Sequence, residues 1–466
     1  MVLYLLEIEQ KVNTNKFILD YNYMKDKNIK FLFCGCGSIG KSLIELWMIN
    51  NLYKNNDICI IDPEPMPEWL LNCRKNIKHI QIGVTKNNIK QLFKKNDKNT
   101  LVIDLTVEVD SFMIIDECIK TKSMYINTSL ENWHDDDKSF SKKYQKFKED
   151  TLYYREMLLE KKLKNNKRTI VTDFGFNPGQ CQMFALTALD MIAKELNVEL
   201  KNKEDYGEFC KKIELESIQI VEFDNQKTDM KQYDDCFYNS WSSLGFQSEG
   251  SDHCMFGYGT IDETFDDWVL IEPTEGEKNI RFIGERSMNL LKESVTLGLN
   301  GECFNFNGML ITHGESNTLS QYLTTKDKTY RPSVYYVYSP CKIAWDCLDK
   351  LRDNDYKFLD FWYILQTDDI SNVEDAFDSI GALLTFKNGK KYWSGSVLSH
   401  KQVLEMGFKY AGTATTVQVC SSVNSAIEWI LRNPNKGYNS PEFLNHREVL
   451  KATAPYLGSL YFGWIC

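Results

Sequence analysis

The stretch Ile29-Lys30-Phe31-Leu32-Phe33-Cys34-Gly35-Cys36-Gly37-Ser38-Ile39-Gly40 decides the fold of this chain. A mostly apolar run leads into a glycine loop, and apolar residues at helical spacing follow between Ser42 and Ile49. This order predicts a strand, a phosphate-binding turn and a helix. The first glycine permits the tight turn, the second lets the backbone approach a pyrophosphate, and the third allows close packing of the helix on the strand. The N-terminus of the helix then offers N–H groups to phosphates.

An acidic residue at the end of the next apolar run indicates which dinucleotide the loop binds. Ile58–Ile61 ends at Asp62, which lies 22 residues after Gly40. A carboxylate there can accept hydrogen bonds from the adenosine ribose hydroxyls and repels a 2′-phosphate, so NAD is favoured over NADP. Ser38, Ile39 and Thr106 are the other predicted cofactor contacts of this half. The alternative is a chance glycine loop in a Rossmann-like domain that binds no nucleotide.

Strands and helices alternate through the first third of the chain. Further strands are predicted at 100–106 and 124–128, with a helix at 111–121 between them. Continuous apolar runs suit strands buried on both faces, so the pattern predicts a doubly wound parallel sheet. A long charged helix at 138–167, a strand at 169–174 and an amphipathic helix at 180–196 are expected next.

The pattern changes beyond residue 205, where short apolar segments alternate with Gly and Asp turns. Strands are predicted at 218–222, 268–271, 304–311 and 333–338, followed by a helix at 417–431. The fold class is therefore α/β, with a Rossmann-type doubly wound parallel sheet plus an α+β domain whose sheet is largely antiparallel. We divide the chain into an NAD-binding domain at 1–178, a second domain at 179–400, and a C-terminal segment at 401–466 that packs back on the first.

Composition narrows the range of functions. The formal net charge of −10 argues against a nucleic-acid partner and is compatible with a cationic substrate. The 14 cysteines and six histidines form no C-x-x-C or H-x-x-x-H pattern, so no metal site is predicted. No signal peptide and no membrane-spanning run are recognised, which favours a cytoplasmic protein with reduced thiols.

Several acidic and aromatic residues suit a polyamine substrate. Glu131, Glu222 and Glu249 can receive ammonium groups, and the face of Trp241 can hold a cation. Taken singly, each has an ordinary explanation as a core or surface residue, and the same holds for His313. Spacing alone does not bring them together.

A succession of motifs resembles bacterial-type homospermidine synthase, a family related to saccharopine dehydrogenase-like enzymes. The resemblance runs in the same order from about residue 29 to the C-terminus. The glycine loop is common to many enzymes, whereas the NSW, SEG and THGES succession is far more specific. The matching blocks are Gly35–Gly40, Ile61–Pro63, Leu130–Trp133, Phe176–Gly179, Asn239–Trp241, Ser248–Gly250, Thr312–Ser316, Tyr330–Pro332 and Pro455–Gly458.

This resemblance implies a function and assigns roles. It implies a homodimeric enzyme, with the second domain serving dimerisation, that uses NAD to condense two putrescine molecules into homospermidine with loss of ammonia. Spermidine and 1,3-diaminopropane are further candidate substrates. Trp241 would make a cation–π contact, Glu131, Glu222 and Glu249 would line the diamine pocket, and a glutamate or His313 would take the ammonium proton. Asp378 would lie near the pocket with His313, and Asn177 would lie close to the nicotinamide.

Two departures and two alternative functions bear on this reading. The family commonly has proline where this chain has Asn132, and aspartate where it has Glu108, and both changes could retune amine specificity. An NAD(P)-linked saccharopine or carboxyspermidine dehydrogenase would need an arginine for a substrate carboxylate, which Arg331 could supply. A catalytically inactive NAD-binding regulator is the third reading, although all the expected pocket residues are present.

Overall fold

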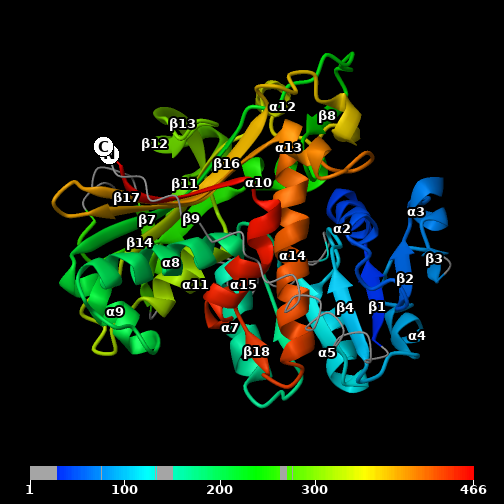
Figure 1. The fold of residues 1–466 in the computed structure, drawn as a ribbon, viewed down its shortest axis with the longest axis horizontal. Coiled ribbons are helices and arrows are strands. Elements are labelled where there is room, and N and C mark those ends of the chain that lie inside the picture. The colour runs from blue at the N-terminus through cyan, green and yellow to red at the C-terminus, as the bar shows by residue number, and fades with distance from the viewer. Residues whose placement is uncertain are drawn as a thin grey trace.

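The computed structural model describes residues 29–74, 76–131, 133, 151–262, 270–274 and 277–465. Its first layer is a seven-stranded sheet in the order β18-β6-β5-β4-β1-β2-β3, in which every neighbouring pair is parallel (Figure 1). The strands are β1 (Lys30–Cys34), β2 (Asp57–Asp62), β3 (Ile77–Gln81), β4 (Thr100–Asp104), β5 (Met124–Asn127), β6 (Ile170–Val171) and β18 (Tyr438–Asn439).

Both faces of this sheet are covered, which explains the continuous apolar runs. On one side Phe31 and Phe33 pack with α2 and α14, and on the other Leu32 and Cys34 pack with α4, α5 and α7. Because side chains alternate along a strand, covering both faces requires every residue to be apolar. The helices are α2 (Ser38–Ile49), α3 (Glu68–Asn72), α4 (Ile89–Phe93), α5 (Ser111–Thr121), α7 (Thr151–Leu163) and α14 (Ala414–Arg432).

The second layer is a ten-stranded, mostly antiparallel sheet. Its main path runs β10-β11-β9-β14-β7-β16-β17-β19, and β13 joins β12 to β14. Only the central pair β14–β7 is parallel among the described pairs of this sheet. The strands are β7 (Leu215–Asp224), β9 (His253–Gly257), β10 (Leu270–Thr274), β11 (Glu277–Arg286), β12 (Leu291–Leu297), β13 (Cys303–Ile311), β14 (Ser333–Ser339), β16 (Phe377–Phe386), β17 (Lys391–Ser399) and β19 (Ser459–Ile465).

Helices and a short two-stranded sheet complete this half. Helix α8 packs against β16 and β17, and α11 packs against β14 (Figure 1). A parallel pair of β8 (Cys236–Asn239) and β15 (Phe361–Ile364) lies outside the large sheet. The helices are α8 (Gln180–Glu195), α9 (Lys203–Lys212), α10 (Ser243–Ser251), α11 (Gly314–Tyr322), α12 (Lys342–Asp353), α13 (His400–Glu405) and α15 (His446–Thr453).

The last 65 or so described residues contact both sheets. Helix α14 lies beside α2, and β18 extends the first sheet at β6. Strand β19 instead pairs with β17 at the edge of the second sheet. The division of the chain at residues 178 and 400 stays a prediction.

The predicted fold class is confirmed, with local corrections. The strand expected at 169–174 is only Ile170–Val171, because Asp173 turns the backbone with a φ of 55°. The charged helix expected at 138–167 is seen from Thr151 to Leu163, and residues 138–150 lie outside the described part. Residues 268 and 269 of the strand expected at 268–271 also lie outside it. Within the described ranges, no helix combines the length and apolar character needed to cross a membrane.

Candidate active site

A cavity of about 540 Å³ lies where loops of the first sheet meet the second layer. The first sheet contributes the glycine loop and the loops that follow β4, β5 and β6. This placement follows from topology, since ligands of open α/β sheets bind beyond the carboxyl ends of the strands. The second layer contributes Glu222 from β7, Tyr336 from β14, and residues of α10 and of the segment before α11.

The glycine loop has the geometry that a dinucleotide phosphate needs. Gly35 has a φ of 77°, and a Cβ there would lie 2.6 Å from the Leu105 carbonyl oxygen, so a side chain is excluded. A Cβ on Gly37 would meet nothing within 4 Å, which leaves open space beside the backbone. Gly37 also precedes α2 without any side-chain cap, so the first N–H groups of α2 face the cavity.

Asp62 lies beneath this loop. Its carboxylate is buried and accepts hydrogen bonds from the backbone N–H of Cys36 at 2.6 Å and of Glu64 at 2.8 Å. Gly35 and Asp62 do not line the cavity themselves, whereas Gly37, Ser38, Ile39, Gly40, Thr106 and Asn177 do. The loop, the open helix end and the carboxylate together fit an adenine dinucleotide.

Glu222 enters the cavity from the centre of the second sheet. It is 2% exposed and accepts hydrogen bonds from the Tyr336 hydroxyl and from Asn177 Nδ2, the latter at 2.8 Å. Burial raises the pKa of the Glu222 carboxyl to about 7, although these two hydrogen bonds oppose the shift. Glu222 therefore exchanges a proton near neutral pH, and Asn177 ties it to the cofactor half.

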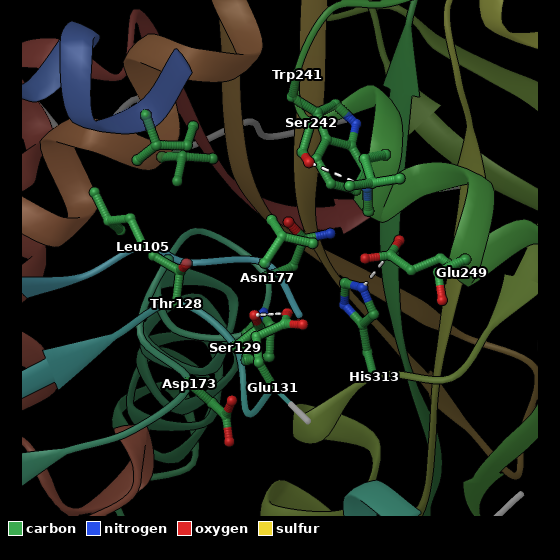
Figure 2. A pocket seen from close by; sticks show the side chains of 18 of the residues that line it. Leu105, Thr128, Ser129, Glu131, Asp173, Asn177, Trp241, Ser242, Glu249 and His313 are labelled. Carbon is green, nitrogen blue, oxygen red and sulfur yellow. Dashed lines mark hydrogen bonds and ion pairs between the residues drawn. The ribbon is translucent and has the colours of Figure 1, made fainter. Parts of the chain in front are cut away.

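His313 lies between two carboxylates. Its Nε2 is 3.6 Å from Glu249 Oε2, its Nδ1 is 3.3 Å from Glu315 Oε1, and its ring stacks on Tyr336 with centroids 4.5 Å apart. Figure 2 shows His313 beside Glu249, with the ion pair between them drawn as a dashed line. Burial alone would lower the pKa of His313, but Glu315 and Glu249 raise it well above its ordinary value. The two carboxylates therefore favour the protonated form of the imidazole.

Trp241 is held at the start of α10. Its Nε1 donates to the Tyr338 hydroxyl at 3.0 Å, and Phe246 packs against its ring. Ser242 caps α10 by accepting from the Gly245 N–H, which fixes the turn that presents the indole to the cavity (Figure 2).

Glu131 lies in the loop after β5. Its Oε1 accepts from Ser129 Oγ at 2.6 Å, and its Oε2 accepts from the Glu108 backbone N–H at 3.1 Å (Figure 2). Glu108 itself, one of the two departures, lines the cavity with a left-handed φ of 61°. Asn132, the other, lies outside the described residues.

Asp378 is near the site but does not line the cavity. It is fully buried on β16, opposite Asp224 on β7. Burial, together with Glu222 and Asp224, raises the pKa of Asp378 well above its ordinary value. This environment favours the protonated, neutral form of Asp378.

Three residues of the site were missed by the sequence prediction. Asp173 lines the cavity, and burial next to Glu315 raises its pKa to about 8. Tyr336 contacts both Glu222 and His313, and Glu315 is buried against His313. Glu315 is the fourth residue of the quoted THGES motif, so a signal for it was present. Asp173 and Tyr336 occur in ordinary strand sequences, and no local pattern distinguishes them.

Acidic side chains outnumber basic ones among the described residues that line the cavity. The described residues that line it include Glu108, Glu131, Asp173, Glu222, Glu249 and Asp252, but neither lysine nor arginine. Arg331 instead donates to Thr324 Oγ1 at 2.9 Å, outside the cavity. Such a lining favours a cationic ligand and offers no lysine or arginine to a substrate carboxylate.

Comparison with known proteins agrees with the fold and with the motifs. Residues 31–171 match the saccharopine dehydrogenase NADP binding domain. Homospermidine synthases of Mesorhizobium japonicum and Blastochloris viridis are each 28% identical to the chain, over 92% of its length and 90% of theirs. The structure of homospermidine synthase from Legionella pneumophila in complex with NAD is 25% identical and superposes with a TM-score of 0.80, covering 94% of this chain and 91% of that one.

A solved structure with lower sequence identity is also similar in fold. Saccharopine dehydrogenase (L-glutamate-forming) from Saccharomyces cerevisiae is 12% identical and superposes with a TM-score of 0.51 over 94% of this chain and 99% of that one. Residues 31–171 thus resemble the NADP binding domain of saccharopine dehydrogenases, and the chain shares the fold of the yeast enzyme. Along nearly its whole length the chain is similar to the homospermidine synthases, which confirms the resemblance predicted from the motifs.

Proposed function

We propose that the chain is a homospermidine synthase, which joins two putrescine molecules and releases ammonia. The observation that carries the proposal is the cavity itself, in which a dinucleotide loop meets a lining of carboxylates and Trp241 without lysine or arginine among the described residues. The homology to homospermidine synthases supports the same assignment.

The cofactor we propose is NAD. Gly37, Ser38, Ile39 and Gly40 would hold the pyrophosphate, Asp62 the adenosine ribose, and Thr106 and Asn177 the nicotinamide end. NAD would take hydride from the amine-bearing carbon of one putrescine and return it once the second putrescine has displaced ammonia. The matching family domain is described with NADP, but a buried carboxylate at position 62 disfavours a 2′-phosphate. NAD is restored in each turnover and is therefore expected to stay bound.

Glu222 is the base we propose. An amine loses hydride only when it is neutral, so a group in the cavity must first accept the ammonium proton. The pKa of Glu222 is raised to about 7, which makes its Oε atoms suitable acceptors near neutral pH. His313 is less suited, because Glu315 and Glu249 favour its protonated form. Of the two kinds of base that the sequence left open, the geometry thus favours the glutamate.

The remaining residues would bind and orient cations. Glu131 and Glu249 would accept hydrogen bonds from the ammonium groups, with His313 holding Glu249 in place. Trp241 would lie against the iminium-like carbon, since a cation over an indole face is stabilised by roughly 2 kcal/mol or more when desolvated. Asp378 would act through Glu222, as a neutral acid behind it.

The alternatives are weaker on specific grounds. A saccharopine or carboxyspermidine dehydrogenase binds a carboxylate, and no arginine lines the described part of the cavity. A catalytically inactive regulator would have no need of a carboxylate held near a pKa of 7 beside a dinucleotide loop. We also propose a homodimer, which light scattering of the purified chain would test.

One incubation tests the function. The purified chain is given putrescine and a catalytic trace of NAD, and homospermidine, ammonia and NADH are measured. A synthase yields homospermidine and ammonia in equal amounts, far in excess of the NAD supplied, without lasting NADH. Stoichiometric accumulation of NADH without homospermidine would instead identify a dehydrogenase, and tight NAD binding without turnover would identify a regulator.

A further inference from the structure

Glu45 is a buried carboxylate whose hydrogen bonds join α2 to residues 409–411, which lie far along the chain. It lies on α2, the helix that begins in the glycine loop, and is fully buried. Its oxygens accept from the backbone N–H groups of residues 409, 410 and 411 at 2.6, 3.0 and 2.8 Å. Ser42, one turn earlier on α2, donates its Oγ to the Ala411 carbonyl oxygen at 2.6 Å. Four hydrogen bonds therefore hold the segment 409–411 on the cofactor helix.

The same segment continues directly into contacts with the substrate side. Thr413 caps α14 and donates its Oγ1 to the carbonyl oxygen of Ser240, at 3.1 Å, immediately before Trp241. The N–H of the next residue, Ala414, donates to Gln226 Oε1 at 2.9 Å. Gln226 in turn donates to Asp224, two residues after Glu222 on β7. The six residues 409–414 therefore join the cofactor helix to the residues that support Trp241 and Glu222.

Holding a loop with a buried carboxylate costs desolvation free energy. Burial raises the pKa of Glu45, and the three backbone N–H groups only partly offset this. Apolar residues of similar volume often give equal or greater stability at such positions. Three converging hydrogen bonds fix one position of the loop relative to the helix, and an apolar contact does not. The hydrogen bonds of Glu45 therefore position the loop more than they stabilise the fold.

We propose that Glu45, through the segment 409–414, is a positioning residue that sets the distance between the nicotinamide and the substrate carbon at Trp241. This inference rests on the proposed synthase function. Hydride must cross between the two halves twice in each turnover, once in each direction. A misplacement of about 1 Å at a reacting centre can reduce the rate about 100-fold, so the relative position of α2 and α10 matters to both transfers.

The test measures how intermediates partition, because this ratio does not depend on how much of the protein is active. When the second hydride transfer is slow, the imine has time to react with water, which releases 4-aminobutanal and an amine and leaves NADH behind. The full-length chain, saturated with NAD and putrescine, is assayed for homospermidine, 4-aminobutanal and NADH. Glu45→Gln, which keeps volume but removes the charge, is expected to raise the ratio of aldehyde to homospermidine about tenfold. The Kd for NAD is expected to stay within about twofold, because Glu45 lies outside the cavity.

A milder variant and a matched control complete the design. Ser42→Ala removes one hydrogen bond to the same segment and is expected to raise the ratio less, so the inference stays testable if Glu45→Gln does not fold. Glu117→Gln serves as control, because Glu117 is also buried but lies on α5, across the first sheet from α2, and pairs with Lys120. Unchanged partition in both variants, with a wild type that makes homospermidine, would overturn the positioning role. A wild type that makes no homospermidine would overturn the proposed function instead.

Discussion

Replacing Glu222 by glutamine separates the chemical use of this residue from its effect on stability. Glutamine keeps an oxygen that can accept from Tyr336 and Asn177, but it cannot take a proton or carry a charge. Turnover should fall by at least about 100-fold, because general-base catalysis typically contributes that much or more. The fold, in contrast, should become more stable at alkaline pH.

The size of the stability change follows from the pKa. In the folded chain the pKa of Glu222 is raised by burial from 4.5 to about 7. Between these values the folded state holds a proton that the unfolded state has lost, so stability falls as pH rises through this window. Each pH unit of the window is worth about 1.4 kcal/mol, and the full difference is about 3 kcal/mol above pH 7. Below pH 4.5 the carboxyl is neutral in both states, and the difference vanishes.

Urea unfolding of wild type and Glu222→Gln at pH 5 and pH 8 measures this directly. The variant should gain about 2 to 3 kcal/mol relative to wild type on going from pH 5 to pH 8. Glu208→Gln, at an exposed position of α9, should show no such pH-dependent gain. A stability difference between wild type and Glu222→Gln that is the same at pH 5 and pH 8 would refute the claim that burial raises the pKa of this carboxyl. A large stability gain with full turnover would refute only its role as base.

Three further predictions concern the same cavity. In wild type, kcat/KM for putrescine should rise with pH through an inflection near 7, and this inflection should be absent from a pH profile of Glu222→Gln, since the pKa of Glu222 is about 7. Trp241→Ala should reduce kcat about 30-fold while changing the Kd for NAD little, because a desolvated cation–π contact is worth roughly 2 kcal/mol; unchanged turnover would exclude the contact. Asp62→Ala should raise the Kd for NAD about tenfold, as the loss of a hydrogen bond to a charged group implies. In a titration the same variant should show a lower ratio of the Kd for NADP to the Kd for NAD. An unchanged ratio would show that Asp62 does not determine the preference for NAD.

The sequence by itself determined the elements whose signal is local. The run 29–40 indicates a strand, a turn and a helix because both faces of β1 must be apolar and because only glycine suits the turn at position 35. Asp62 could be placed from its distance along the chain, since the acid must end the strand next to β1. The motif succession gave the homology and, through it, the candidate residues.

Two of the elements that the sequence did not reveal, β3 and β18, lack such local signals. Strand β3 is a half-exposed edge strand with a polar, mixed sequence, and β18 is two residues long and joins the first sheet from position 438. Their pairing depends on partners elsewhere in the chain, which no window of sequence contains.

The environment of each side chain was decided only by the tertiary structure. Glu222, Trp241 and His313 come from different elements, and their order in the sequence does not say which of them shares a hydrogen bond or a charge. The structure buries Glu222 with Tyr336 and Asn177 and raises its pKa to about 7, whereas it places His313 between two carboxylates that favour its protonated form. A pKa depends on burial and on neighbouring charges, and both are properties of the packed molecule. The sequence therefore supplied the chemical groups, and the packing of two sheets decided which group can act as a base.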